Sequence, residues 1–154
     1  MLKKIFFIIL SLNLLNHCDY KPVYSKQNNI NHKIVVNSFD GDKDINNLIV
    51  NNLERISEKN SKNTINISFN TIYTKKIIAK NNKGTITDYQ SNVETTFLIT
   101  KKNSTENFVV EEKFNFQKMA DKYEEKNYER NVKKNFASSI SQTLILRWPI
   151  TEWY

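Results

Sequence analysis

The sequence predicts an α+β fold, a two-layer sandwich in which two helices lie on one face of a four-stranded, mostly antiparallel sheet. Two segments carry apolar residues at helical spacing, and three long segments between them alternate apolar and polar residues with a period of two. Short turn sequences separate these three segments. Helices with one apolar stripe and a sheet with one apolar face bury both surfaces most economically by packing together.

The first strand and the first helix are predicted near the start of the domain. The short β-branched run 33–39 indicates a strand, and Asp40-Gly41-Asp42 indicates a turn. Asp42 or Asp44 can then cap a helix, because a short carboxylate accepts hydrogen bonds from the free N–H groups of the first turn. The helix is expected to run to about Lys59, with one apolar stripe formed by Ile45, Leu48, Ile49, Leu53 and Ile56.

Three strands are predicted next, over residues 64–80, 85–101 and 108–117, as an antiparallel meander. Residues 81–84 and 102–107 are expected to form the two turns. The face predicted to be buried consists of Ile65, Ile67, Phe69, Thr71, Tyr73, Tyr89, Val93, Phe97, Ile99, Phe108, Val110, Phe114 and Phe116. The opposite face carries mainly Asn, Ser, Thr, Gln and charged residues, so it is expected to meet water or a polar partner.

The second helix is predicted from about Tyr123 to Arg147, followed by Pro149. Its apolar residues recur every four positions, at Tyr128, Val132, Phe136, Ile140 and Leu144. Glu129 and Lys133 stand four apart, in the order that favours an ion pair within a helix. The chain closes with an aromatic tail of Trp148, Trp153 and Tyr154. Core packing is the default for this tail, with a partner contact or a membrane-interface anchor as alternatives.

The residue pattern argues against an enzyme. Glu111 and Glu112 are neighbours in a strand and therefore point to opposite faces. Asp88 and Glu94 share a face but lie about 20 Å apart at the rise of a strand, too far for a pair of catalytic carboxylates. The two histidines, one of which is His32, have no partner at a catalytic or metal-binding spacing. We therefore expect no catalytic residues, no metal site and no cofactor.

Charge and composition restrict the class of partner. The net charge is +7, but the lysines are scattered among acidic residues and form no basic block. Nucleic-acid binding is therefore not expected. A mildly basic surface fits an encounter with anionic lipid or acidic glycolipid. On charge alone, however, a solvated surface without a specific partner is the better explanation.

The N-terminal residues predict export and lipidation. Residues 1–17 have two early lysines and an apolar run too short to span a bilayer core of roughly 30 Å, which is typical of a signal peptide. Cys18, the chain's only cysteine, follows directly and is predicted to be acylated, with residues 18–32 as a lipidated tether and 33–154 as one domain. Asn16 and His17 depart from the small residues usual before such a cysteine, so cleavage elsewhere with Cys18 as a chance thiol remains the alternative.

The opening Cys18-Asp19-Tyr20-Lys21-Pro22-Val23-Tyr24 resembles that of the LPS-assembly lipoprotein LptE family in its alphaproteobacterial form. The late helical segment 128–146 also resembles the terminal helix of that family, with alternating charged, small and apolar residues. The order of helices and strands is similar over nearly the whole chain, and the specific residues lie near both ends. Asp19 stands where relatives usually have Gly, which leaves an inner-membrane location open.

The resemblance implies a lipoprotein anchored on the periplasmic side of the outer membrane, with an LptD-like β-barrel and lipopolysaccharide as partners. It would plug and help assemble the barrel and assist lipopolysaccharide insertion at the cell surface. The candidate lipopolysaccharide-binding residues are Lys75, Lys76, Lys80 and Lys83, which can pair with lipid A phosphates as point charges. Solvated lysines that discourage edge pairing are the alternative. An accessory lipoprotein of another envelope transport complex and a periplasmic binding domain for a small ligand remain rival functions.

Overall fold

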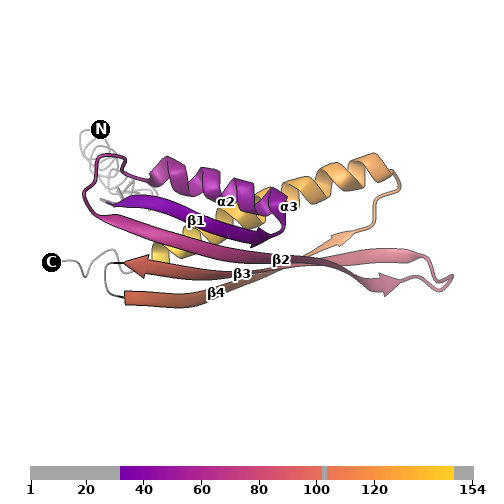
Figure 1. Ribbon diagram of the computed structural model, residues 1–154. Helices are drawn as coiled ribbons and strands as arrows, with labels where there is room; N and C mark the ends of the chain where they lie inside the picture. Colours follow the sequence, from indigo (N-terminus) through magenta and orange to yellow (C-terminus); the bar gives the residue numbers. More distant parts are fainter. Residues whose placement is uncertain (1–31, 102–103, 148–154) are drawn as a thin grey trace, which may run out of the picture.

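The computed structural model describes residues 32–101 and 104–147, which form a four-stranded sheet with two helices on one face (Figure 1). The strands lie in chain order, and β1 is parallel to β2 whereas the other neighbours are antiparallel. This architecture confirms the predicted two-layer α+β sandwich. Its elements are β1 (Lys33–Gly41), α2 (Lys43–Ile56), β2 (Thr64–Lys80), β3 (Ile86–Lys101), β4 (Ser104–Gln117) and α3 (Lys122–Arg147).

The junction between β1 and α2 differs from the predicted turn. β1 continues through Asp40 to Gly41, because Gly41 pairs with Thr71 of β2 at a φ of +93°. Asp42 is the helix cap, and its Oδ1 accepts a hydrogen bond from the backbone N–H of Ile45 at 3.0 Å. The helix ends at Ile56 rather than near Lys59, because the following residue adopts an extended backbone and caps the last turn.

The meander follows the predicted alternation, and its first hairpin is closed by polar groups. Asn81 Oδ1 accepts hydrogen bonds from the N–H groups of Lys83 and Thr85, and Gly84 adopts a φ of +77°. The last strand begins earlier than expected. β4 already begins at Ser104, which pairs with Lys101, so residues 104–107 are strand rather than turn.

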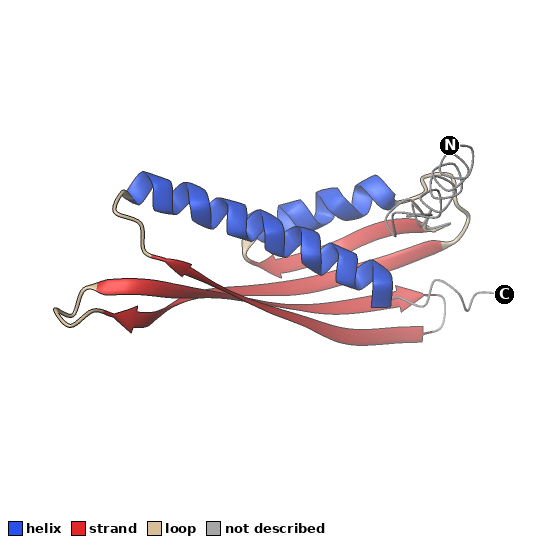
Figure 2. Ribbon diagram, turned by 180° about the vertical axis from the view of Figure 1, so that it is seen from behind, coloured by secondary structure: helices blue, strands red, loops and turns tan. Residues whose placement is uncertain are grey.

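The apolar core lies between the sheet and the helices, as the side-chain periodicity predicts. Figure 2 shows α3 running across the sheet with α2 on the same face. The stripes of the two helices and the inner sheet face supply the buried side chains, among them Ile45, Ile49, Leu53, Ile67, Val93, Phe97, Phe136, Ile140 and Leu144. Asn52 of α2 also donates to Ser141 Oγ of α3 at 3.4 Å, which ties the two helices directly.

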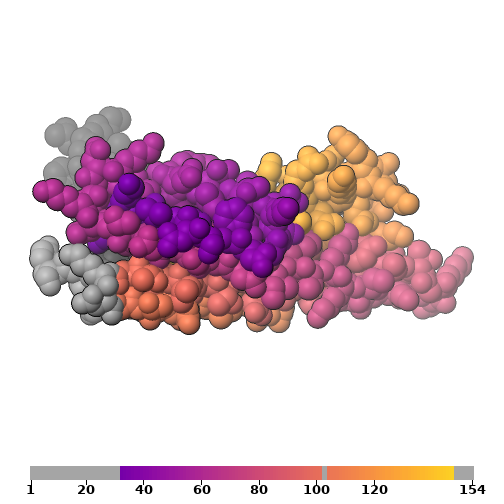
Figure 3. Space-filling view, viewed as in Figure 1, coloured from indigo at the N-terminus to yellow at the C-terminus, as the bar shows by residue number. Residues whose placement is uncertain are grey.

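The sheet has two halves with different coverage. In the proximal half, β1 pairs with β2 as far as Thr71, and both helices lie above the strands. In the distal half, β2 continues with β3 and β4 to the hairpin at residues 81–84, and only the first part of α3 lies above it. The space-filling view shows the resulting elongated shape, with the hairpin projecting beyond the helices (Figure 3).

Several predictions fall outside the described residues. These are the signal peptide 1–17, the lipidated Cys18, nearly all of the tether 18–32 and the aromatic tail 148–154. Within the described part of the chain, neither helix combines the length and the apolarity needed to cross a membrane.

Candidate functional site

The outer face of the sheet points away from both helices, and no described element covers it (Figures 1 and 2). Strand alternation and register place on it the neutral polar side chains of Ser68, Asn70, Thr74, Gln90, Asn92, Thr96, Asn107 and Asn115. Cross-strand hydrogen bonds order part of this face. Gln90 donates to Asn115 Oδ1 at 2.9 Å, and Ser38 donates to Ser68 Oγ at 3.1 Å.

The alternation of the sequence predicts a mainly polar outer face, but three aliphatic side chains interrupt it. Ile72, Leu98 and Val109 are 51%, 40% and 48% exposed, and they lie on three neighbouring strands. Their cross-strand partners in the register are Glu94, Asn107 and Thr96, so the patch occupies three consecutive rows of the sheet. Charged side chains lie on this face as well, because Glu94 and Glu111 share the row of Ile72, and Lys113 pairs with Glu111 at 3.0 Å. A polar surface with an aliphatic centre is the usual anatomy of a protein-docking surface.

The four candidate lysines are divided between the two sides of the sheet. Lys76 lies on the outer face, while Lys80 and Lys83 lie at the distal hairpin, and all three are exposed. Lys75 points to the helix side, because it follows Tyr73 by two positions in the strand. There its Nζ lies 2.8 Å from Glu125 Oε1, 3.1 Å from Glu129 Oε2 and 4.3 Å from the centre of the Tyr89 ring.

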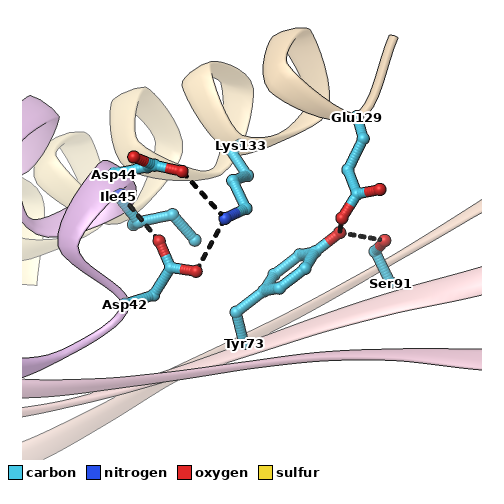
Figure 4. Close-up of polar contacts among 7 residues, drawn as sticks. All are labelled: Asp42, Asp44, Ile45, Tyr73, Ser91, Glu129 and Lys133. Atoms are coloured by element: carbon cyan, nitrogen blue, oxygen red, sulfur yellow. Dashed lines mark hydrogen bonds and ion pairs between the residues drawn. The ribbon is translucent and has the colours of Figure 1, made fainter. Parts of the chain in front are cut away.

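A polar network joins α3 to the sheet and to the start of α2 (Figure 4). The Tyr73 hydroxyl lies 2.7 Å from Ser91 Oγ and donates to Glu129 Oε1 at 2.9 Å. Lys133 Nζ donates to Asp42 Oδ2 at 2.7 Å and to Asp44 Oδ2 at 3.2 Å. The expected pair within the helix, Glu129 with Lys133, is therefore wrong, since each residue takes partners from other elements.

Sequence reasoning missed this network because its members come from four elements far apart in the chain. The available signal was Tyr73 and Lys75 on the face predicted to be buried, where a phenol and an ammonium group need polar partners. A second signal was the acidic residues at every fourth position of α3, which are Glu125 and Glu129. No local pattern indicates which lysine each of these carboxylates meets.

The protonation states of the network are fixed around neutral pH. Burial raises the pKa of the Tyr73 hydroxyl, and the hydrogen bond to Glu129 raises it further against the opposing effect of Ser91. Burial by itself lowers the pKa of Lys75, but its hydrogen bonds to Glu125 and Glu129 outweigh this and raise the pKa. Lys133 shows the same balance, with Asp42 and Asp44 as partners. All three groups keep their protons at neutral pH, so the network ties the layers together.

An open groove of about 650 Å³ lies between the start of α2 and the first half of α3. Its walls carry Asp44, Asn47 and Leu48 from α2, and Lys126, Glu129, Arg130, Lys133 and Lys134 from α3. Within residues 32–101 and 104–147, no group of three or more His, Cys, Asp or Glu side chains is arranged to hold a metal ion.

Comparison with protein-family models and with curated proteins gives no match. Among solved structures, the chain is similar to rare lipoprotein B from Shewanella oneidensis, with a TM-score of 0.53 and 11% identity over 71% of this chain and 94% of that one. A candidate lipoprotein from Caulobacter crescentus has a TM-score of 0.49 at 5% identity, over 78% of this chain and 89% of that one. The first likeness shows that the chain shares the fold of a lipoprotein.

Proposed function

We propose that this chain is an outer-membrane lipoprotein, anchored on the periplasmic side through Cys18, that plugs an LptD-like β-barrel. In this role it helps the barrel to assemble and assists the insertion of lipopolysaccharide at the cell surface. The observation that carries the proposal is the uncovered outer sheet face, with its polar side chains around Ile72, Leu98 and Val109.

The chemistry of this face suits the inside of a wide barrel. The interior of a membrane β-barrel is polar, so a docking partner needs polar, hydrogen-bonding groups rather than a continuous apolar surface. The molecule is also long and thin, since the 17 residues of β2 extend over about 55 Å at the rise of a strand. A slender sheet of this length can lie along a barrel wall.

The anchor and the fold support the same function. The signal sequence followed by Cys18 and the Cys-x-aromatic-x-Pro-x-Tyr opening resemble the LptE family, whose members act in this way. The fold is shared with rare lipoprotein B, which is itself a lipoprotein. These two arguments are independent of each other, because the opening residues lie outside the part of the chain that the structure describes.

Lysines at the distal end are the candidate contacts to lipopolysaccharide. Lys76, Lys80 and Lys83 are exposed there and can meet lipid A phosphates as point charges. Lys75 differs from them, because its ammonium group already binds two carboxylates. We therefore expect substitution of the three exposed lysines to weaken lipopolysaccharide binding more than substitution of Lys75 does.

Co-purification tests the proposal directly. The chain carries a C-terminal tag, membranes are extracted in mild detergent, and proteins that travel at equal stoichiometry are identified. An LptD-like barrel in the outer-membrane fraction is the expected result. The Cys18→Ala variant should lose incorporation of labelled fatty acid. Recovery with inner-membrane transporter subunits would instead indicate an accessory lipoprotein of another complex, and recovery alone would favour a periplasmic binding domain.

A matched pair of variants tests which face docks. Thr96→Arg places a bulky cation in the middle of the outer sheet face and should abolish co-purification with the barrel. Asn135→Arg makes the same change in charge at an exposed position of α3 and should leave it intact. Loss of the barrel in both variants, or in neither, would refute docking through the outer sheet face.

A further inference from the structure

In the first half of α3, two carboxylates point toward the sheet and three cations point away from it. The inward carboxylates, Glu125 and Glu129, are bound by Lys75 of the sheet. The two carboxylates at the start of α2 are likewise bound by Lys133. The outward cations Lys126, Arg130 and Lys134 are exposed, and none of them has an ion pair within the described residues. The carboxylates of these four acidic residues are therefore already occupied. The remaining acidic residue in this half of α3, Glu124, is exposed and forms no ion pair with these cations among the described residues.

These cations share one flank of the helix with an exposed aromatic ring. Tyr123, Lys126, Arg130 and Lys134 follow one another at spacings of three, four and four, which keeps them on one side over about 16 Å of helix. Tyr123 is 73% exposed, unlike the buried or half-buried aromatic residues of the core. We call these four residues the basic flank.

A second cluster of exposed cations differs from the basic flank, because acidic residues lie among its cations. Lys33, Arg55 and Lys59 line a groove at the proximal end, but Glu54 and Glu58 lie among them. On the basic flank, the adjoining groove contributes Asp44 and Glu129, which are already bound to Lys133 and Lys75. The basic flank therefore combines an exposed aromatic ring with three cations that form no ion pair within the described residues.

We propose that the basic flank is a docking surface for an anionic phospholipid membrane. Basic segments bind anionic lipid surfaces through the summed attraction of their cations, and tyrosine favours the boundary between headgroups and acyl chains. The helix layer then lies on the bilayer, and the outer sheet face, on the opposite side of the sheet, points away from it and stays accessible to a partner. This contact goes beyond the proposed function, since it requires no barrel and describes the domain before it docks.

The test measures sedimentation of the full-length, unlipidated Cys18→Ala chain with vesicles. Vesicles containing phosphatidylglycerol are compared with vesicles of pure phosphatidylcholine. In the flank variant, Lys126→Gln, Arg130→Gln and Lys134→Gln are combined. The control variant combines Lys33→Gln, Arg55→Gln and Lys59→Gln, which removes the same number and kind of charges. The N-terminal apolar segment is identical in all chains, so the differences report the substituted residues.

The flank variant should bind the anionic vesicles about a hundredfold more weakly, because each cation near such a surface contributes roughly a factor of five. The control variant should change by only a few fold, and about 0.5 M NaCl should remove the difference between flank variant and parent by screening. Tyr123→Ala should cause a smaller loss that salt does not affect. Circular dichroism of each variant checks that the fold is unchanged.

Several results would overturn the proposal. These are equal losses in the flank and control variants, unchanged binding of the flank variant, and equal binding of the parent chain to both kinds of vesicle. Binding to polyglutamate through the flank without binding to vesicles would also overturn it, in favour of an acidic protein partner. Co-purification of the flank variant with the barrel is measured separately, so failure of membrane docking and failure of the barrel proposal can be told apart.

Discussion

The two halves of the sheet are stabilised in different ways. In the proximal half, two helices cover the strands, and the space between the layers is filled by apolar side chains such as Phe97, Ile140 and Leu144. In the distal half, only the first part of α3 lies above the sheet, and long polar side chains reach across. Tyr73, Lys75 and Glu129 form the centre of that contact.

The difference shows how a single helix can stay attached to a long, twisted sheet. One helix cannot bury a full sheet face, so the part of the sheet beneath α3 stays partly exposed to water. Polar side chains are tolerated there, and the hydrogen bonds and ion pairs that they form hold α3 to the sheet. Aromatic rings supply the remaining contact, with the ring of Tyr128 5.5 Å from that of Phe116. The distal half therefore depends on hydrogen bonds and rings, whereas the proximal half depends on hydrophobic burial.

The largest expected effect lies in the proximal half. Phe97→Ala should lower the free energy of unfolding by about 3–5 kcal/mol, because Phe97 is fully buried and its ring packs against those of Phe69 and Phe108. Leu98→Ala, at the next position on the outer face, should lower it by less than about 1 kcal/mol. Urea denaturation measures both values. Similar losses in the two variants would contradict the assignment of Phe97 to the core.

The boundary between the two halves should be the next most sensitive point. In Gly41→Ala, a Cβ would overlap the carbonyl oxygen of Thr71 and sit at a positive φ, so we expect a loss of about 2 kcal/mol or more. Gly84→Ala is the matched control, since its φ is also positive but its Cβ would meet open space. It should lose only about 1 kcal/mol by the same urea measurement. Equal losses would mean that the close approach of Gly41 to the backbone of Thr71 does not contribute to stability.

A smaller effect is expected from the ion pairs of the distal half. Lys75→Gln should lower the free energy of unfolding by about 1–2 kcal/mol, because it leaves Glu125 and Glu129 without their cation beneath α3. A double-mutant cycle with Glu125→Gln measures the pairwise part of this loss. Additive losses in the cycle would show that the distal half does not depend on this pair.

The smallest effect should appear as a dependence on pH. Burial raises the pKa of Tyr73, so the folded chain keeps this proton at a pH at which the unfolded chain releases it. The stabilisation is complete below the unfolded pKa of about 10 and is lost as the pH rises above it. Tyr73→Phe should lose about 1 kcal/mol at neutral pH and should show a shallower decline at alkaline pH than the parent chain. Parallel declines in urea titrations would contradict this assignment.

Local patterns predicted most of the fold. The period of two correctly assigned the inner faces of β2, β3 and β4, and the stripe of α3 is buried at Val132, Phe136, Ile140 and Leu144. The errors lie at the ends of strands, where pairing with a neighbouring strand determines whether a residue belongs to the strand or to a turn. Residues 40–41 and 104–107 resemble turns locally but pair with neighbours that the local sequence does not indicate. Of the candidate site, the uncovered polar face was predicted, whereas its aliphatic patch was underestimated.

The sequence by itself determined the order of the elements, which face of each is buried, and the motif that predicts the lipid anchor, because these depend on residue spacing along one segment. Only the tertiary structure decided that Lys75 pairs with Glu125 and Glu129, and that Lys133 pairs with Asp42 and Asp44. It also decided which cations on α3 form no ion pair within the described residues. The physical reason is that an ion pair depends on the distance between groups in space, and only packing brings residues from different elements together.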